Sequence, residues 1–309
     1  MSTTITIAHL TDVHLGPIAG FKPRYWNLKR LTGYINWQRK RRDAYQREVL
    51  DRLMQDLQAQ RPDHIAVTGD LANIGLPQEL INAQRWLESV GAPHQVTVIP
   101  GNHDIYSGMR GDPGTLRWQA YMSSDAQGAE LAGKAAAFPF VRMLGRVALI
   151  GLNSATETAP LMAWGRVGRA QLDRVARVLD RLGQEDVFRL VLIHHPPLPG
   201  QASRTRGLRD AAALEQVLTR HGAELVIHGH NHHNMLAWRR APSGAVPVVG
   251  APSASLGRRH KNEPLARYNL YRVDGPPWRI EMVGRGLAEP GGPVVELERR
   301  ALVMHEPPS

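Results

Sequence analysis

The sequence has no cysteine among its 309 residues. This absence excludes a disulfide framework, a thiolate zinc site, an iron–sulfur cluster and a cysteine nucleophile. The chain also lacks any run of about 18 apolar residues and any basic, apolar leader at its start, so we expect neither a transmembrane helix nor a signal peptide. These absences predict a cytoplasmic protein, with peripheral contact to the membrane left open.

Acidic residues are missing from one stretch of the chain. Residues 21–42 contain eight basic side chains and neither Asp nor Glu, so they account for most of the net charge of +10. Aromatic and aliphatic residues lie between these cations, a pattern that suits a helix on an anionic membrane surface, an ordinary solvated face or a nucleic-acid groove. Nucleic acid ranks last because no second cluster of equal density follows. The candidates for substrate or membrane contact are Lys29, Arg30, Trp37, Lys40 and Arg41.

Short apolar runs alternate with helical patterns along most of the chain. Buried strands are predicted over 5–10, 64–68, 95–99, 147–153, 189–193 and 224–228. Apolar residues at helical spacing predict helices over 45–57, 172–182 and 208–221. Three further strand-like runs (246–250, 268–273 and 279–283) follow with no helix between them. This order indicates an α/β core with a second sheet that is completed late in the chain.

Five polar motifs each follow a predicted strand. They are Asp12-Val13-His14, Gly69-Asp70, Gly101-Asn102-His103-Asp104, His194-His195-Pro196-Pro197 and Gly229-His230-Asn231-His232. Because open α/β sheets build their sites at strand C-termini, these distant motifs can converge on one edge. Carboxylates, imidazoles and one amide, without a thiolate, suit Mn, Fe, Co or Zn. Each motif alone is also compatible with ordinary turn residues, but the ordered set predicts a metal site.

The ordered motifs resemble those of the calcineurin-like metallophosphoesterases. The resemblance covers residue 5 to about residue 235. It implies a four-layer α-β-β-α sandwich of two mixed sheets flanked by helices, with a dinuclear metal site at the strand C-terminal ends. The family fold would continue to about residue 285, as a single domain over 1–285 with 21–42 inserted near the site. Residues 286–309 are rich in Gly and Pro, and we expect them to form a loosely held tail.

The resemblance also implies roles for individual residues. One metal ion would be held by Asp12, His14, Asp70 and His232, and the other by Asp70, Asn102, His194 and His230. Asp70 would bridge the two ions, and His103 would stabilise or protonate the leaving oxygen without binding metal. Manganese or iron is expected before cobalt or zinc. The residues alone leave open whether His194 or His195 is the ligand, and the family pattern favours His194.

The implied activity is hydrolysis of a phosphodiester or pyrophosphate bond by a metal-bridging hydroxide. The protein phosphatases of the family have Glu where this chain has Asp104, which argues against that activity. The basic aromatic segment beside the first motif favours a membrane-borne nucleotide lipid such as UDP-2,3-diacylglucosamine. The alternatives are a soluble 3′,5′-cyclic-nucleotide phosphodiesterase, a nuclease and a non-catalytic metal-binding scaffold. The sequence leaves the oligomeric state open.

Overall fold

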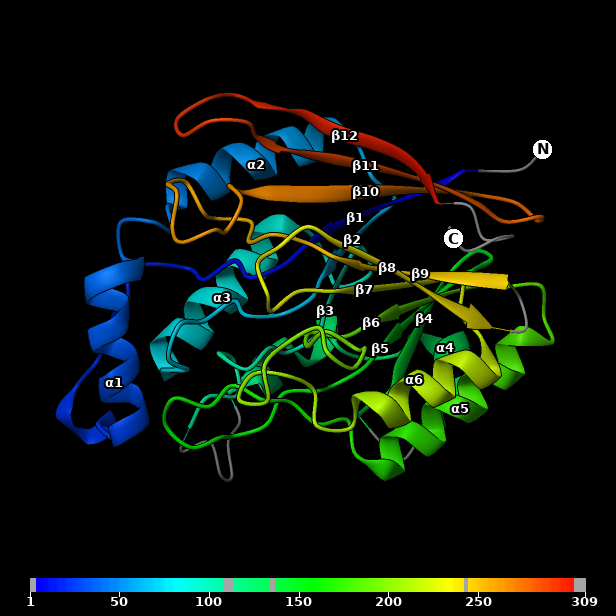
Figure 1. The fold of residues 1–309 in the computed structure, drawn as a ribbon, viewed down its shortest axis with the longest axis horizontal. Helices are drawn as coiled ribbons and strands as arrows, with labels where there is room; N and C mark the ends of the chain where they lie inside the picture. Colours follow the sequence, from blue (N-terminus) through cyan, green and yellow to red (C-terminus); the bar gives the residue numbers. More distant parts are fainter. Residues whose placement is uncertain (1–3, 108–113, 134–136, 242–243, 303–309) are drawn as a thin grey trace.

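The computed structural model describes residues 4–107, 114–133, 137–241 and 244–302, and two six-stranded sheets form its centre (Figure 1). The first sheet has the order β12-β11-β10-β1-β2-β3. Its strands are β1 (Ile5–Leu10), β2 (His64–Val67), β3 (Val96–Val98), β10 (Arg267–Asp274), β11 (Arg279–Leu287) and β12 (Val294–Leu302). Because β1 pairs in parallel with β2 and antiparallel with β10, this sheet is mixed.

The second sheet has the order β4-β5-β6-β7-β9-β8. Its strands are β4 (Phe140–Leu144), β5 (Val147–Gly151), β6 (Phe188–Leu192), β7 (Leu225–His228), β8 (Met235–Ala241) and β9 (Gly244–Gly250). The four inner strands run parallel, and β4 and β8 are antiparallel edges. The inner strands are mostly apolar because both of their faces are covered, and the buried Arg189 of β6 forms an ion pair with Glu224.

Helices cover the outer faces of the two sheets. They are α2 (Arg47–Ala59), α3 (Pro77–Val90), α4 (Ala126–Ala132), α5 (Arg169–Gly183) and α6 (Ala211–His221). On β5, Leu149 points to the core between the sheets, whereas Ala148 and Ile150 pack against α5 and α6. The apolar faces of α2 and α3 pack against the first sheet. The predicted four-layer α-β-β-α sandwich is confirmed.

Helix α1 (Leu28–Asn36) stands apart from the sheets at one edge of the molecule (Figure 1). It continues into a π-helical turn, η2 (Trp37–Arg41), and a short 3-10 turn, η1 (Pro23–Tyr25), precedes it. A Cβ on Gly33 would collide with the Tyr106 hydroxyl and with Ile74. This glycine weakens the intrinsic helix propensity but permits the close approach of α1 to the protein body.

The prediction of a loosely held tail over residues 286–309 is wrong for the part that the structure describes. β11 runs past the expected boundary, and β12 pairs with it along its whole length as the edge of the first sheet. The charged pattern hid this strand, because its Arg299 forms ion pairs with Glu296 and Glu281 instead of facing an apolar core. Residues 303–309 of the expected tail lie outside the described residues. The sequence patterns also missed α3, α4, β4 and β8.

Within the described ranges, no helix is both long enough and apolar enough to cross a membrane.

Candidate active site

The five motifs lie in the loops that leave β1, β2, β3, β6 and β7 at their carboxyl ends. Backbone strain gathers there. Of the eight non-glycine residues with positive φ in the described parts of the chain, five belong to these motifs: Asp12, His14, Asp70, His230 and His232. Leu161 and Lys261, also with positive φ, line the adjoining pocket. Such conformations are uncommon outside glycine, and their clustering marks a functional site.

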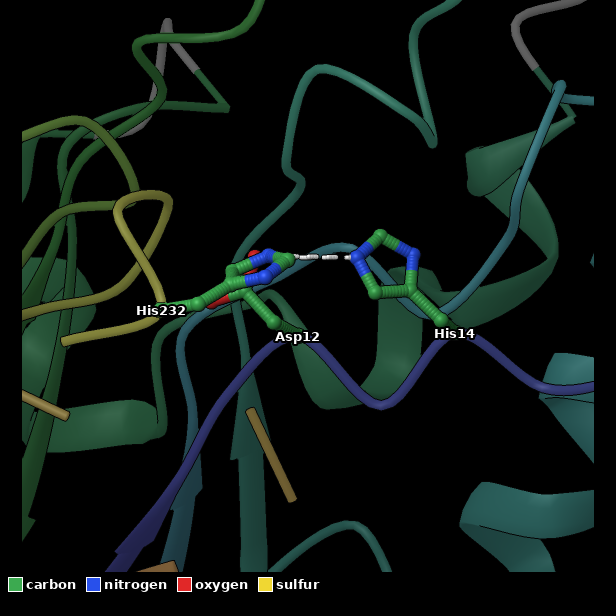
Figure 2. A group of neighbouring side chains, drawn as sticks. All are labelled: Asp12, His14 and His232. Carbon is green, nitrogen blue, oxygen red and sulfur yellow. Dashed lines mark hydrogen bonds and ion pairs between the residues drawn. The ribbon is translucent and has the colours of Figure 1, made fainter. Parts of the chain in front are cut away.

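Asp12, His14 and His232 form the first metal-capable cluster (Figure 2). His232 Nε2 lies 3.0 Å from Asp12 Oδ1 and 3.4 Å from His14 Nε2. His14 Nδ1 donates to the Ala72 carbonyl at 3.1 Å, and His232 Nδ1 donates to Glu263 Oε2 at 2.9 Å. With these protons on Nδ1, the neutral rings would present both Nε2 lone pairs beside the Asp12 carboxylate. A metal cation fits this arrangement, because it would relieve the repulsion between the nitrogen lone pairs and the carboxylate oxygen.

Asp70, Asn102, His194 and His230 form a second cluster of the same kind. His194 Nε2 lies 3.2 Å from Asn102 Oδ1, 3.3 Å from His230 Nδ1 and 3.4 Å from Asp70 Oδ2. His194 Nδ1 donates to the Thr68 carbonyl at 2.7 Å, so the Nε2 lone pair would face the cluster once this ring is neutral, as a metal ligand must be. His230 Nδ1 also lies 2.7 Å from Asn102 Oδ1, so imidazole nitrogens, an amide oxygen and a carboxylate converge here, and a metal cation fits this cluster as well.

Asp70 lies between the two clusters. Its carboxylate belongs to one metal-capable group with His194 and His230 and to another with His14 and His103. Burial opposes ionisation of Asp70, but His194 and His103 hold the pKa of its carboxyl well below its usual range. In return, although burial opposes it, Asp70 raises the pKa of His194 to about 9. Asp70 is thus the group that could contact both metal ions.

The two neighbouring histidines of the fourth motif have different surroundings. Both ring nitrogens of His195 are engaged away from the cluster, Nδ1 with Ser154 Oγ at 2.8 Å and Nε2 with the Ala163 carbonyl at 3.2 Å. His194 alone of the pair directs a ring nitrogen at Asp70 and Asn102. The geometry favours His194 as a ligand over His195, a choice that the residues alone left open.

His103 lies at the pocket side of the second cluster and stays partly exposed. Its backbone N–H donates to Asp70 Oδ1 at 2.7 Å, and its Nδ1 bonds to the Asn73 carbonyl. Its Nε2 is 3.4 Å from Arg41 Nη1, and its ring stacks on Tyr106. Burial lowers the pKa of His103 to about 4; Asp70 opposes this shift and Arg41 adds to it. His103 directs Nε2 into the pocket beside Arg41.

Asp104 has a structural role that the motif did not reveal. It is fully buried and accepts four backbone N–H groups at 2.8–2.9 Å, those of Asp70, Leu71, Ala72 and Gly101. These contacts join the loops after β2 and β3. The sequence signal was present, since Asp104 is part of the third motif, but four backbone partners could not be inferred from it.

Tyr45 and Glu263 were also missed as site residues. The Tyr45 hydroxyl lies 3.0 Å from both His232 Nδ1 and Glu263 Oε2, and Glu263 accepts the His232 proton. The sequence patterns assigned Tyr45 to the buried face of a helix, although it precedes α2. Glu263 lies in no motif, so no sequence signal could have found it.

A cavity of about 220 Å³ opens beside the two clusters. Its lining includes four cationic side chains: Lys29, Arg41, Arg206 and Lys261. The acidic side chains of the lining, Asp70 and Glu263, are both paired with histidines. The cavity therefore offers positive charge in addition to any bound metal, and it suits an anionic ligand.

The structure gives different surroundings to the candidate residues for substrate or membrane contact in the basic segment. Lys29, Arg30 and Trp37 are buried, while Lys40 is exposed and Arg41 lines the pocket. Lys29 Nζ donates to the Tyr106 carbonyl at 2.8 Å and to Thr158 Oγ1 at 2.7 Å.

Arg30 Nη2 donates to the Gly75 carbonyl at 2.9 Å. Because buried carbonyl groups are costly without a hydrogen-bond donor, these bonds favour the inward orientation of Lys29 and Arg30. A membrane-facing role for Lys29, Arg30 or Trp37 is therefore wrong. Lys29 remains within reach of a ligand in the pocket.

A family model described as calcineurin-like phosphoesterase matches residues 5–234. The chain belongs to this family. It is thus a phosphoric ester hydrolase of a family that depends on a dinuclear metal site, and its Asp and His groups could hold the metals.

Two curated relatives are phosphodiesterases. The chain is 25% identical over 234 residues to a probable cyclic nucleotide phosphodiesterase of Synechococcus, across 74% of this chain and 78% of that protein. It is 28% identical over 237 residues to a cAMP/cGMP dual specificity phosphodiesterase of Mycobacterium tuberculosis, across 74% of this chain. The aligned part spans 62% of that second relative.

Among solved structures, the fold is similar to a dimetal phosphatase from Danio rerio, with a TM-score of 0.64 and 16% identity over 97% of this chain and 99% of that one. It is also similar to a purple acid phosphatase from yellow lupin, with a TM-score of 0.59 and 11% identity over 99% of this chain and 55% of that one. At these identities, the two likenesses show a shared fold.

Proposed function

We propose that seven residues of the motifs form a two-metal centre and that this centre hydrolyses a phosphodiester or pyrophosphate bond in a substrate with a further anionic group. One ion would be held by Asp12, His14, Asp70 and His232, and the other by Asp70, Asn102, His194 and His230. Bound there, the metal ions would supply Lewis-acid charge to the phosphoryl group and activate the attacking water. The convergence of lone pairs in both clusters supports this assignment.

The chain's own groups orient the ligands. Carbonyl groups of Ala72 and Thr68 and the Glu263 carboxylate hold the Nδ1 protons of three histidines, which fixes the ring tautomers. Asp104 keeps two ligand loops together. His103 directs Nε2 into the pocket, where it would stabilise or protonate the leaving oxygen.

The single observation that carries the substrate class is the set of four cationic side chains in the pocket lining. A cyclic nucleotide has one phosphate with one negative charge, and the metal ions would already neutralise it. A pyrophosphate diester has a second phosphate, and Arg41 lies beside His103 where this group could be bound. A nucleotide joined to a lipid, such as UDP-2,3-diacylglucosamine, has this chemistry.

A 3′,5′-cyclic nucleotide is the second candidate substrate. It is favoured by the curated relatives, which are named as cyclic nucleotide phosphodiesterases. The same ligand set and the same His103 would act on its phosphodiester.

The test is hydrolysis by the Mn-loaded protein of UDP-2,3-diacylglucosamine and 3′,5′-cyclic AMP, side by side. Our proposal predicts fast release of UMP from the lipid and little turnover of cyclic AMP. The reverse preference would replace the first candidate with the second. An Asp70→Ala variant, purified in the same way, controls for contaminating hydrolases, since it should lose both activities.

A further inference from the structure

Helix α1 has the reverse of the usual distribution of side chains. Its two basic residues, Lys29 and Arg30, are buried, and large apolar side chains point to solvent. The exposed fractions are 57% for Trp26, 67% for Leu28, 40% for Leu31 and 41% for Ile35. The last three recur at i, i+3 and i+7, which places them on one face of the helix. We call these three residues, together with Trp26 just before the helix, the outer face of α1.

Exposed large hydrophobic side chains are concentrated on the outer face of α1. It contains four of the seven large hydrophobic residues that are exposed across the described residues. Exposed apolar side chains scattered singly are normal, whereas a contiguous group marks a surface that binds a partner. The helix stands at the edge of the molecule, away from both sheets (Figure 1). The group is therefore free to meet a large partner.

The charge around this face selects the class of partner. Exposed cations precede and follow the helix in the sequence: Lys22, Arg24, Arg39, Lys40 and Arg42. A second copy of the chain would bring the same cations together, and a nucleic acid would leave the leucines without a partner. An anionic bilayer suits both the apolar face and the cations around it. Its interface accepts the apolar side chains, and its headgroups attract Lys and Arg.

We propose that the outer face of α1 docks on an anionic lipid surface. The inner side of the same helix lines the catalytic pocket through Lys29, Thr32, Gly33 and Asn36. Leu161, which is 88% exposed, lines the pocket as well. Docking would therefore hold against the bilayer the helix that forms one wall of the pocket. The idea that this orientation helps a membrane-borne substrate to reach the pocket rests on the proposed function. Lipid binding itself is measured without a substrate.

Co-sedimentation with vesicles tests this docking. We expect the full chain to bind vesicles of phosphatidylcholine and phosphatidylglycerol, to bind pure phosphatidylcholine less, and to be released as salt is raised. The triple variant Leu28→Gln, Leu31→Gln, Ile35→Gln should bind about tenfold less or weaker still. The matched control is Leu116→Gln with Leu297→Gln, which changes exposed leucines elsewhere and should bind like the wild type.

Two results would overturn the docking proposal: a wild-type chain that binds neither vesicle, and a triple variant that binds as the wild type does. A wild-type dimer without lipid, dissociated by the triple variant in sedimentation equilibrium, would also overturn it in favour of a second copy.

Hydrolysis of soluble bis(p-nitrophenyl) phosphate by the Mn-loaded protein is measured in parallel, and the triple variant should retain it. Vesicle binding by a chain that hydrolyses no phosphodiester would support docking while the proposed function fails.

Discussion

The strand-end loops and helix α1 meet at one pocket, yet they hold their polar side chains in different ways. In the loops, His14 and His194 are each fixed by a backbone carbonyl, and His14, Asp12 and His232 have strained backbones. In α1, long flexible cations reach across to carbonyls of other segments, and the opposite face lacks a packing partner.

This difference separates two tasks. The loops grow directly out of the core strands, so the geometry of the candidate centre is part of the fold itself. Helix α1 is added at the rim and contributes cations and apolar surface that could change without altering the core. We infer that the loops supply the chemistry and that α1 selects the substrate and its source. The predictions below test this division, beginning with the largest effect.

Replacing the carboxylate that both clusters share should have the largest effect. We expect Asp70→Ala to lose both metal ions and to lower turnover on the order of a thousandfold or more, because neither cluster keeps its charge. Elemental analysis of the purified variant measures the metal content. Asp186→Ala, which removes an exposed ion pair with Arg146, is the control and should keep two ions. If the Asp70→Ala variant still contained two metal ions, the proposal that Asp70 bridges them would be wrong.

His103→Ala should separate chemistry from metal binding. We expect the metal content to be unchanged and kcat to fall by roughly 10²–10⁴, because the group beside the leaving oxygen is lost. His221→Ala, a surface histidine paired with Asp180, should leave kcat unaltered. Normal kcat in the His103 variant, or loss of metal from it, would contradict the assigned role.

The contrast between loops and helix should also appear in the free energy of unfolding. Asp104→Asn replaces an oxygen that accepts two backbone N–H groups with an NH₂ donor, so we expect a loss of about 2–5 kcal/mol. Arg30→Met removes donors to the Ile74 and Gly75 carbonyls at the rim, and we expect about 1–2 kcal/mol. Urea unfolding measures both. Equal losses would argue that α1 is as integral to the fold as the loops.

Arg41→Gln tests substrate selection by the helical segment. For UDP-2,3-diacylglucosamine in detergent micelles, we expect kcat/KM to fall about 10–100-fold, because a charged contact to the second phosphate is lost. For cyclic AMP, the fall should be much smaller. Lys40→Gln changes the adjacent exposed cation and should affect neither substrate in micelles. An equal loss on both substrates would mean that Arg41 acts on His103 and not on the second phosphate.

The two regions also differ in how far the sequence predicts them. Each loop motif directly follows an apolar run, so local order in the chain was enough to anticipate an α/β core and the convergence of residues such as Asp70 and His230, whereas the four-layer sandwich was implied by the family resemblance. The inward turn of Lys29 and Arg30 depends on carbonyls of Tyr106 and Gly75, which lie far away in sequence. Composition alone could not reveal those partners.

Long-range pairing explains the other misses. Glu263 becomes part of the site only because the fold brings it to His232, 31 residues away. Strand β12 carries alternating charges that pair with its neighbour, so it has no apolar signature. In both cases the stabilising contact is made by a residue that a local window does not contain.

The central claim is that two metal ions share Asp70 in a centre built from the strand-end loops. A crystal structure of the Mn-loaded protein, with anomalous scattering measured at the manganese edge, tests it most directly. The account predicts two anomalous peaks, one among Asp12, His14 and His232 and the other among Asn102, His194 and His230, with Asp70 between them. A single peak, or peaks that do not contact Asp70, would contradict it.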